Sequence, residues 1–456
     1  MRRLEADVCV VGAGFSGLMA ARRLSEAGKH VIVLEARDRV GGRVHTVTEA
    51  GAVLDLGGQW VGPTQDRING FAAEIGARTF VTYGEGSHLY ASRSPAGASG
   101  KPKRFKGTIP PLDPWSLAWL GYGWAELDRR AKKVPLDAPW TAPRAREWDG
   151  QTVASFLDRH VRAEPARRMF RIAIEAVFAC DPEDLSLLHA LFYIHSAGKL
   201  DLLLSTDAGA QRDRFVNGMQ PVAEELAKRV KGEIVQGAAV RSISQDASSV
   251  VVVASTVSVR AKRAVVAIPP TLAGRIDYSP ALPADRDQLT QRVPQGSVIK
   301  CLAVYDEPFW RKQWLTGQSI SEVGPCHLTF DASPASGSPG VLLGFVEGGA
   351  ARALARQPLA ERRTSVLECF ARAFGGRARR PEHYVDKSWA DEPFSRGCYA
   401  GYLPPGVWTS HGSALRAPIG RLHWAGTETA TRWNGYIDGA LESGVRAATE
   451  ILKEER

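Results

Sequence analysis

Apolar and polar positions near the start of the chain change from one periodicity to another. Residues 7–11 (DVCVV) and 30–34 (HVIVL) are short apolar runs of the kind that forms buried strands. Between them, residues 17–28 repeat apolar positions at helical spacing and end on Gly28, a common helix stop. This order of strand, helix and strand predicts the opening of a doubly wound parallel sheet, and therefore an α/β, Rossmann-like domain.

The pattern changes several times further along the chain. Residues 110–198 are predicted to be mostly helical, whereas alternation in residues 240–243, 250–253 and 264–268 predicts a small sheet. Mixed strands are expected within residues 297–345, and residues 359–374 read as an amphipathic helix. The last segment, residues 423–453, returns to a strand, a glycine-rich loop and a helix.

Composition narrows the class of protein. The 456 residues are 44% apolar, and no apolar run approaches the ~20 residues needed to span a bilayer, so we expect a cytoplasmic protein without a membrane anchor. The six cysteines include no CxxC pair, which argues against a disulfide scaffold and a zinc site. The net charge of +9 is diffuse and is not interleaved with aromatics, so we expect no nucleic-acid partner.

The turn after the first strand carries the motif GxGxxG. Gly12 allows the tight turn, Gly14 lets the backbone approach a pyrophosphate, and Gly17 lets the helix pack closely on the strand. The helix start at Phe15 and Ser16 offers free amides to the phosphates. Glu35, at the end of the second strand, is placed to accept hydrogen bonds from a ribose.

Further glycine-rich segments follow this dinucleotide motif. Ala36 and Arg37 begin the segment 36–46, in which Gly42 permits close approach and Arg43 could pair with a phosphate. A second strand end, residues 54–65, contains the run Gly57, Gly58, Gln59 and Trp60. A nicotinamide-binding fold has no need of this second segment, whereas the longer FAD does. Because no second GxGxxG is present, the substrate itself should be the reductant.

Cofactor-binding segments at both ends of the chain predict a discontinuous domain. We expect an FAD-binding domain over residues 1–80, 212–288 and 392–456. A substrate-binding domain, with a mixed sheet and helices, should cover residues 81–211 and 289–391, which makes the protein α+β overall.

Four long blocks then resemble one family. Residues 8–46, 296–310 (GSVIKCLAVYDEPFW), 396–406 (RGCYAGYLPPG) and 423–444 look like the flavin-containing monoamine oxidases, in order and over essentially the whole chain. The resemblance implies oxidative deamination of an amine with dioxygen as electron acceptor, and a homodimer.

The resemblance also implies roles for individual residues. Lys300 matches the lysine that holds a water against the flavin and assists oxidation by dioxygen, and Tyr399 with Tyr436 matches the aromatic cage around the amine. Cys398 matches the cysteine that bonds to the flavin in covalent members, although Arg396 replaces a glycine of their usual motif. Further residues implied to contact FAD are Val240, Trp389, Gly426, Thr427 and Gly435.

The substrate is inferred from the residues that match the cavity wall. The gate positions are apolar, at Leu204 and Leu328, and Gln211 is the one polar group expected in the wall. A diamine oxidase would need an acid where Leu328 stands. An amino-acid oxidase would need an arginine, for which Arg212, Arg214 and Arg311 are candidates by type alone.

We therefore predict that the substrate is a primary aryl- or alkylmonoamine. The alternatives are a diamine, polyamine or cyclic-amine oxidase, an FAD dehydrogenase or desaturase on the same scaffold, and a flavin-bearing interaction protein without turnover.

Overall fold

The fold is described from a computed structural model that covers residues 1–93 and 100–454. Within these residues, an eight-stranded sheet has the order β10-β2-β1-β13-β12-β11-β14, and β20 also pairs with β13. Its strands are β1 (Arg2–Val11), β2 (Val31–Leu34), β10 (Gly232–Val235), β11 (Val240–Gln245), β12 (Val250–Ala254), β13 (Val257–Val266), β14 (Asp277–Ser279) and β20 (Leu422–Trp424).

Strand β1 shows why the first apolar run is buried. Val8 and Val10 face one hydrophobic cluster, whereas Cys9 and Val11 face another on the opposite side of the sheet. Successive side chains of a strand point to opposite faces, so a strand covered on both faces is apolar throughout. The predicted parallel strand–helix–strand opening is confirmed, because β1 pairs with β2 in parallel register.

The strands predicted within residues 240–268 are present as β11, β12 and β13, but they form part of the eight-stranded sheet rather than a small sheet. Strands β10 to β13 join the same sheet as β1, with β13 parallel to β1 and β12 antiparallel to β13. Alternation identified the strands correctly but carries no information about which distant strand each one pairs with.

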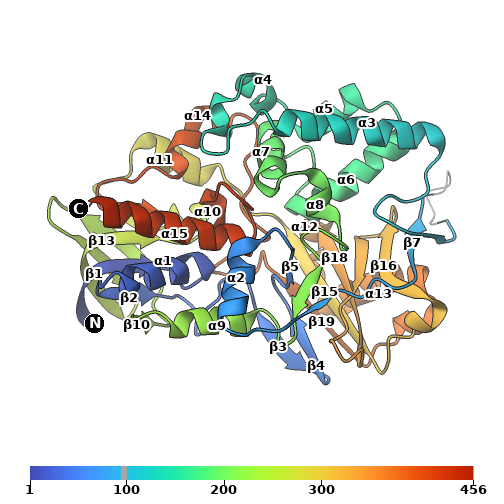
Figure 1. Ribbon diagram of the computed structural model, residues 1–456, viewed down its shortest axis with the longest axis horizontal. Helices are drawn as coiled ribbons and strands as arrows, with labels where there is room; N and C mark the ends of the chain where they lie inside the picture. The colour runs from blue at the N-terminus through green and yellow to red at the C-terminus, as the bar shows by residue number, and fades with distance from the viewer. Residues whose placement is uncertain (94–99, 455–456) are drawn as a thin grey trace.

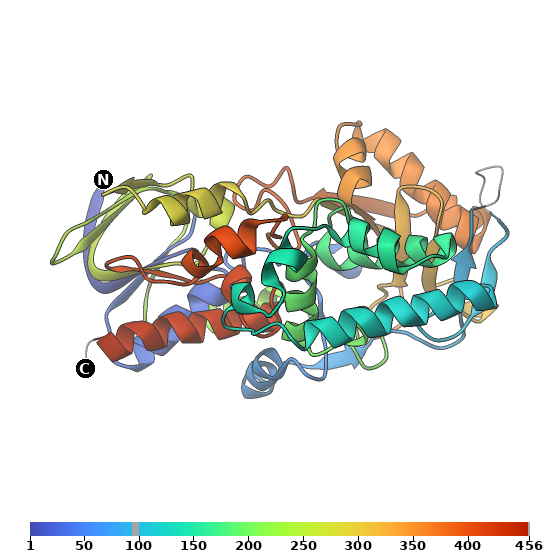
Figure 2. The ribbon, with the colours of Figure 1, turned by 90° about the horizontal axis from the view of Figure 1, so that it is seen from above.

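Helices from opposite ends of the chain cover one face of this sheet. Helix α1 (Phe15–Glu26) lies beside α15 (Ile437–Glu454), and both pack in the cluster that contains Val8 and Val10 (Figures 1 and 2). The other helices of this half are α2 (Asp66–Glu74), α9 (Gln220–Lys228), α10 (Pro270–Ala273) and α11 (Ala284–Gln291).

A second, mixed sheet forms the other end of the molecule (Figure 1). Its order is β19-β15-β18-β17-β16-β7-β8. The strands are β7 (Ser87–Ala91), β8 (Lys103–Phe105), β15 (Val298–Tyr305), β16 (Leu315–Ser321), β17 (Cys326–Asp331), β18 (Gly340–Glu347) and β19 (His383–Ser388). Helices α12 (Gly348–Leu354) and α13 (Leu359–Phe374) pack against it, and the bounds predicted for α13 are confirmed.

A helical layer lies above this sheet and extends over the middle of the molecule (Figures 1 and 2). It contains α3 (Pro114–Ala131), α4 (Ala145–Asp149), α5 (Val153–His160), α6 (Glu164–Phe178), α7 (Leu187–Ala197), α8 (Leu200–Leu204) and α14 (Val407–His411). The sequence marks several starts, because Asp113, Thr152 and Ser186 accept hydrogen bonds from the third helical amide. The helical character predicted for residues 110–198 is confirmed.

Smaller elements connect the two halves. Strands β3 (Thr46–Glu49) and β4 (Ala52–Asp55) form a hairpin, and β9 (Asp213–Phe215) pairs with β5 (Trp60–Val61) and β6 (Thr79–Val81). The remaining 3-10 turns are η1 (Pro139–Thr141), η2 (Arg311–Gln313), η3 (Gly376–Arg379), η4 (Gly412–Leu415) and η5 (Thr427–Thr429). The two sheets agree with the expected pair of domains, but the domain boundaries stay a prediction, and residues 94–99 and 455–456 lie outside the described residues.

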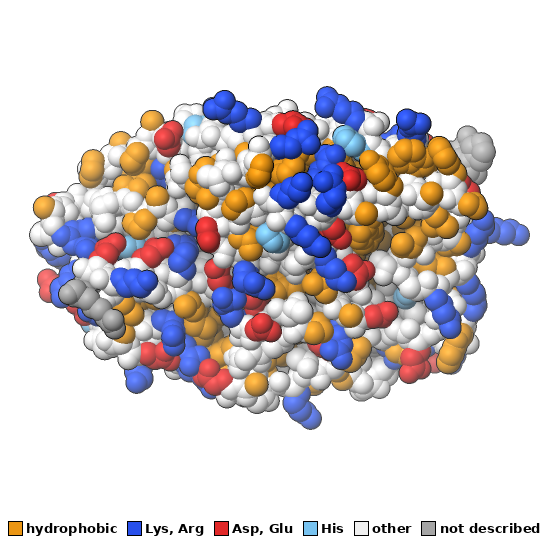
Figure 3. Space-filling model, turned by 45° about the horizontal axis from the view of Figure 1, so that its top comes forward, with side chains coloured by type: hydrophobic (Ala, Val, Ile, Leu, Met, Phe, Trp, Pro, Cys, Tyr) orange, Lys and Arg blue, Asp and Glu red, His pale blue; other side chains and the backbone are white. Residues whose placement is uncertain are grey.

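The surface matches the diffuse positive charge. On the face that Figure 3 presents, Lys and Arg side chains are spread between Asp and Glu side chains and apolar atoms. No helix in the described part of the chain is long and apolar enough to cross a membrane.

Candidate active site

The glycine turn after β1 opens onto a cavity of about 530 Å³. Gly12 has φ +99°, and a Cβ on Gly17 would lie 1.9 Å from the Gly12 carbonyl oxygen, so the turn and the helix meet without room for side chains. Helix α1 begins at Phe15, and its cap residue Gly14 has no side chain to bond to the first amides. This helix N-terminus therefore offers amides and partial positive charge to an anion in the cavity.

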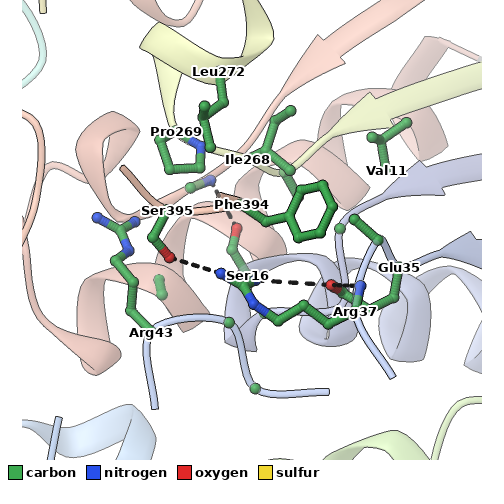
Figure 4. Close-up of a pocket in the computed structure, with 18 of the residues that line it drawn as sticks. Val11, Ser16, Glu35, Arg37, Arg43, Ile268, Pro269, Leu272, Phe394 and Ser395 are labelled. Atoms are coloured by element: carbon green, nitrogen blue, oxygen red, sulfur yellow. Dashed lines mark hydrogen bonds and ion pairs between the residues drawn. The ribbon is translucent and has the colours of Figure 1, made fainter. Parts of the chain in front are cut away.

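Glu35 and Arg37 shape the next part of this cavity (Figure 4). The buried Glu35 carboxylate accepts hydrogen bonds from the amides of Ala13 (2.7 Å) and Arg37 (2.9 Å). The Arg37 guanidinium donates to Ser395 Oγ at 2.9 Å and to Glu392 at 3.2 Å, which holds the segment 392–395 over the cavity. Ser395 was not predicted as a site residue, because its contact is made only across a separation of 358 residues.

The C-terminal glycine motif folds back onto the N-terminal turn. The Gly426 amide donates to Ser16 Oγ at 2.8 Å and to Ser443 Oγ at 3.1 Å, and Thr427 Oγ1 donates to the Tyr436 carbonyl at 2.7 Å. Ser443, on α15, was not predicted as a site residue. These contacts join both ends of the chain in one wall.

Arg43 has a partner that the sequence did not predict. Its guanidinium forms a two-pronged ion pair with Glu428, at 2.6 and 3.1 Å, and also donates to the Tyr399 carbonyl. The Arg43 charge compensates the buried carboxylate and holds the pKa of Glu428 below its usual range despite burial. Pairing of Arg43 with a phosphate stays a prediction, and the α1 N-terminus is the better placed positive group.

The predicted cofactor residues lie along two adjoining cavities. Those lining the larger cavity are Gly12, Gly14, Phe15, Ser16, Glu35, Ala36, Arg37, Gly42, Arg43, Gly58, Val240, Cys398, Gly426, Thr427, Gly435 and Tyr436. Gly57, Gln59, Trp60 and Trp389 line the second cavity, of about 170 Å³, and Gly17 packs helix on strand. Cys398, Tyr399, Gly435 and Tyr436 line both. The larger cavity contains the α1 N-terminus in its wall and adjoins the second cavity, which fits the negative charge and the two-part structure of FAD.

Lys300 lies in the wall of the second cavity. It is 3% exposed, and its Nζ donates to the Gly57 carbonyl at 2.8 Å and to Gln59 Oε1 at 2.7 Å. Burial lowers the pKa of Lys300 to about 7. The lysine can therefore hold or release a proton near neutral pH, as a lysine on a solvated strand edge cannot.

Tyr399 and Tyr436 stand where the two cavities meet. The Tyr399 hydroxyl donates to Glu347 Oε1 at 2.9 Å, and its ring packs edge-on against Phe345. The Tyr436 ring packs against Trp433, with the centroids 4.9 Å apart. Burial raises the pKa of both phenols, so both rings are uncharged near neutral pH.

The far wall of the second cavity contains the predicted gate residues. Leu204 and Leu328 line this cavity and also a neighbouring cavity of about 120 Å³, so they lie between the two. Gln211 lines the wall and donates to the Leu203 carbonyl at 3.0 Å.

The expectation that Gln211 is the one polar group of the wall is wrong. Glu347 and Tyr193 also line the cavity. Glu347 was not predicted, because an acid that follows the apolar run of β18 is more often the solvated end of a strand.

None of the arginine candidates for a carboxylate clamp lines this cavity, and neither does any other arginine in residues 1–93 and 100–454. Arg214 donates to the Ser333 carbonyl, and Arg311 pairs with Asp331 at 2.8 Å. A substrate carboxylate would find no bidentate partner here.

Cys398 is buried at the junction of the cavities, as a bond to a cofactor there requires. Burial raises the pKa of its thiol to about 12, and the charge of Arg43 opposes this rise. Arg396, which replaces the expected glycine, has φ +56°, so the backbone keeps a conformation that glycine favours.

Comparisons with known proteins agree with this geometry. A family model described as flavin containing amine oxidoreductase matches residues 15–452. The chain is 40% identical to amine oxidase (flavin-containing) B of Canis lupus familiaris, over 98% of this chain and 86% of the relative.

Solved structures are also similar over nearly the whole chain. A putrescine oxidase with bound putrescine has a TM-score of 0.94 at 33% identity, covering 99% of this chain and all of that one. Cyclohexylamine oxidase from Brevibacterium oxydans IH-35A has a TM-score of 0.92 at 31% identity, with the same coverage. An alanine-to-cysteine variant of the putrescine oxidase is described as a redesign of cofactor binding.

Proposed function

The chain belongs to the family of flavin-containing amine oxidoreductases, and from this premise we propose that it oxidises a primary aryl- or alkylmonoamine to an aldehyde, ammonia and hydrogen peroxide. The observation that carries the proposal is the second cavity, in which Tyr399, Tyr436 and Lys300 face a far wall of leucine and phenylalanine. When bound, FAD supplies the two-electron redox chemistry, with dioxygen as the final acceptor.

The protein's own residues bind, orient and desolvate the amine. The two tyrosine rings attract an amine through their faces, each contact contributing ~0.5–2 kcal/mol. Leu204, Leu328 and Phe330 exclude water from the opposite end, which favours the uncharged amine over the ammonium. Lys300, with its lowered pKa, can hold a proton or a water beside the same space.

A diamine oxidase is the second candidate, because the chain is similar to putrescine oxidase and a carboxyl, Glu347, lines the cavity. A distal ammonium needs an anion remote from the aromatic cage. Glu347 instead bonds to the cage residue Tyr399, and the remote gate positions are Leu204 and Leu328. This placement favours a monoamine.

The covalent link through Cys398 is part of the proposal. The buried thiol lies where the two cavities meet, beside Tyr399 and Arg43. The cysteine variant described as a redesign of cofactor binding in putrescine oxidase supports the idea that a cysteine can serve this purpose on the same scaffold.

A homodimer and a cytoplasmic location stay predictions. Light scattering on the purified protein tests the first, and fractionation of the source cells tests the second.

An anaerobic amine panel tests the proposed reaction. Benzylamine, tyramine and a linear alkylamine should bleach the visible flavin band faster than putrescine or cyclohexylamine. A clear preference for putrescine would replace the monoamine proposal with the diamine alternative. A clear preference for cyclohexylamine, a primary monoamine whose imine hydrolyses to a ketone, would favour the cyclic-amine alternative and exclude the aldehyde product. Efficient dye reduction with little peroxide would indicate a dehydrogenase.

A further inference from the structure

Glu347, the last residue of β18, is a buried carboxyl in the wall of the proposed substrate cavity. Glu347 is 3% exposed. Its Oε1 accepts a hydrogen bond from the Tyr399 hydroxyl at 2.9 Å, whereas its Oε2 is buried without a hydrogen-bond partner. A buried carboxyl with only one of its two oxygens hydrogen-bonded lowers the free energy of unfolding, which indicates a functional role at this position.

The strand register places Glu347 on the reactive face of the sheet. In the antiparallel pair β15–β18, Lys300 lies opposite Phe345 and Val298 lies opposite Glu347. Opposite residues share a face, and alternate residues along a strand return to it. Glu347 is therefore diagonal to Lys300, because it lies two residues beyond Phe345 on β18. It faces the same cavity, whose lining includes all four residues.

The charges around Glu347 come from several elements. Lys300 faces the cavity from β15, Tyr399 lies on the segment after β19, and Glu175 lies on α6. Asp181, beside Gly348, is paired with Arg352 at 2.6 Å. Burial raises the pKa of Glu347 to about 8, the Tyr399 hydrogen bond opposes this rise, and the like charge of Glu175 adds to it.

We propose that Glu347 is a positioning residue that anchors the Tyr399 ring through its hydroxyl and, by gaining or losing a proton, sets the charge beside the aromatic cage. The inference rests on the proposed function, because the cage acts on an amine. The hydrogen bond and the edge contact with Phe345 together hold the plane of the Tyr399 ring.

The charge has a definite effect on the amine. A carboxylate beside the cage stabilises the ammonium form of a bound amine, which cannot give up a hydride equivalent, whereas the protonated acid does not. The apparent pKa of the bound amine should therefore be higher when Glu347 can ionise than when it cannot.

The test compares Glu347→Gln with Glu347→Leu in the holoenzyme, with benzylamine as the probe. Glutamine keeps an acceptor for Tyr399 but cannot ionise. We expect the rising limb of its pH profile of anaerobic flavin reduction to move down by about one pH unit. Leucine loses both roles, and kcat/KM should fall about tenfold, the loss expected for one hydrogen bond.

A neighbouring carboxyl supplies the matched control. Glu175→Gln leaves the Tyr399 contact intact and removes one like charge, so Glu347 should ionise at lower pH. Infrared difference titration of the holoenzyme measures this without turnover: the protonated carboxyl signal should titrate near pH 8, vanish in Glu347→Gln and move to lower pH in Glu175→Gln. Tyr399→Phe with Glu347 intact should reproduce the anchoring loss if Glu347→Leu fails to fold.

The outcomes separate the two proposals. A wild-type pH profile in Glu347→Gln, or wild-type kcat/KM in Glu347→Leu, overturns the inference and leaves the proposed function standing. A wild-type holoenzyme that no amine bleaches refutes the proposed function instead, and the infrared titration still decides whether Glu347 exchanges a proton.

Discussion

Replacing Lys300 with methionine should change how stability depends on pH. The ordinary pKa of a lysine is 10.5, and burial lowers that of Lys300 to about 7. Between these values the unfolded chain binds more protons than the folded one, so the contribution of Lys300 makes the free energy of unfolding rise with pH. Integrating over one site gives a rise of about 3–4 kcal/mol from pH 7 to pH 10.

Denaturant unfolding of wild type and Lys300→Met at several pH values measures this contribution. Subtracting the free energy of unfolding of the variant from that of wild type removes the contributions of the cysteines and tyrosines that titrate in the same pH range. Lys387, directly opposite Lys300 on β19 and paired with Glu392 at 2.9 Å, supplies the control variant Lys387→Met for loss of a lysine from the neighbouring strand.

A flat difference between pH 7 and pH 10 would refute the burial argument for Lys300. Methionine also leaves the Gly57 carbonyl and Gln59 Oε1 without a donor, each costing ~1–3 kcal/mol. That cost does not depend on pH, so it shifts the whole curve and cannot imitate the slope.

Three further predictions follow from the site. Cys398→Ala should release yellow colour to the supernatant on acid unfolding while wild type retains it, and release from both would exclude the covalent link. Gly17→Ala should lose most bound FAD, because its Cβ would lie 1.9 Å from the Gly12 carbonyl oxygen. The control Gly70→Ala in α2, where no atom lies within 4 Å of the added Cβ, should raise the free energy of unfolding by ~0.5–1 kcal/mol. The flavin-to-protein absorbance ratio measures the first change, and thermal unfolding measures the second. Arg43→Met should lower the free energy of unfolding by ~3–5 kcal/mol in denaturant titration, because it leaves Glu428 buried and unpaired. Adding Glu428→Gln should restore part of this loss, whereas a loss below ~1 kcal/mol for Arg43→Met would contradict the ion-pair argument.

Short-range sequence patterns are enough to predict the local elements and the glycine turn after β1. The strand β1, the helix that follows the glycine turn and the helix of residues 359–374 depend on such patterns, and the structure confirms all three. The binding of a cofactor by the glycines at 12, 14 and 17 stays a prediction. The resemblance of long blocks to one family identified the class of reaction, and the comparisons confirm it.

Tertiary structure alone decided which distant segments meet. Strands β11 to β13 join the same sheet as β1, Arg43 pairs with Glu428 across 385 residues, and Glu347 reaches Tyr399 across 52. Periodicity reports which face of an element is buried but not what covers that face. For the same reason an acid at a strand end can be solvated or can lie in a dry cavity, and its pKa and chemistry depend on neighbours that only the fold supplies.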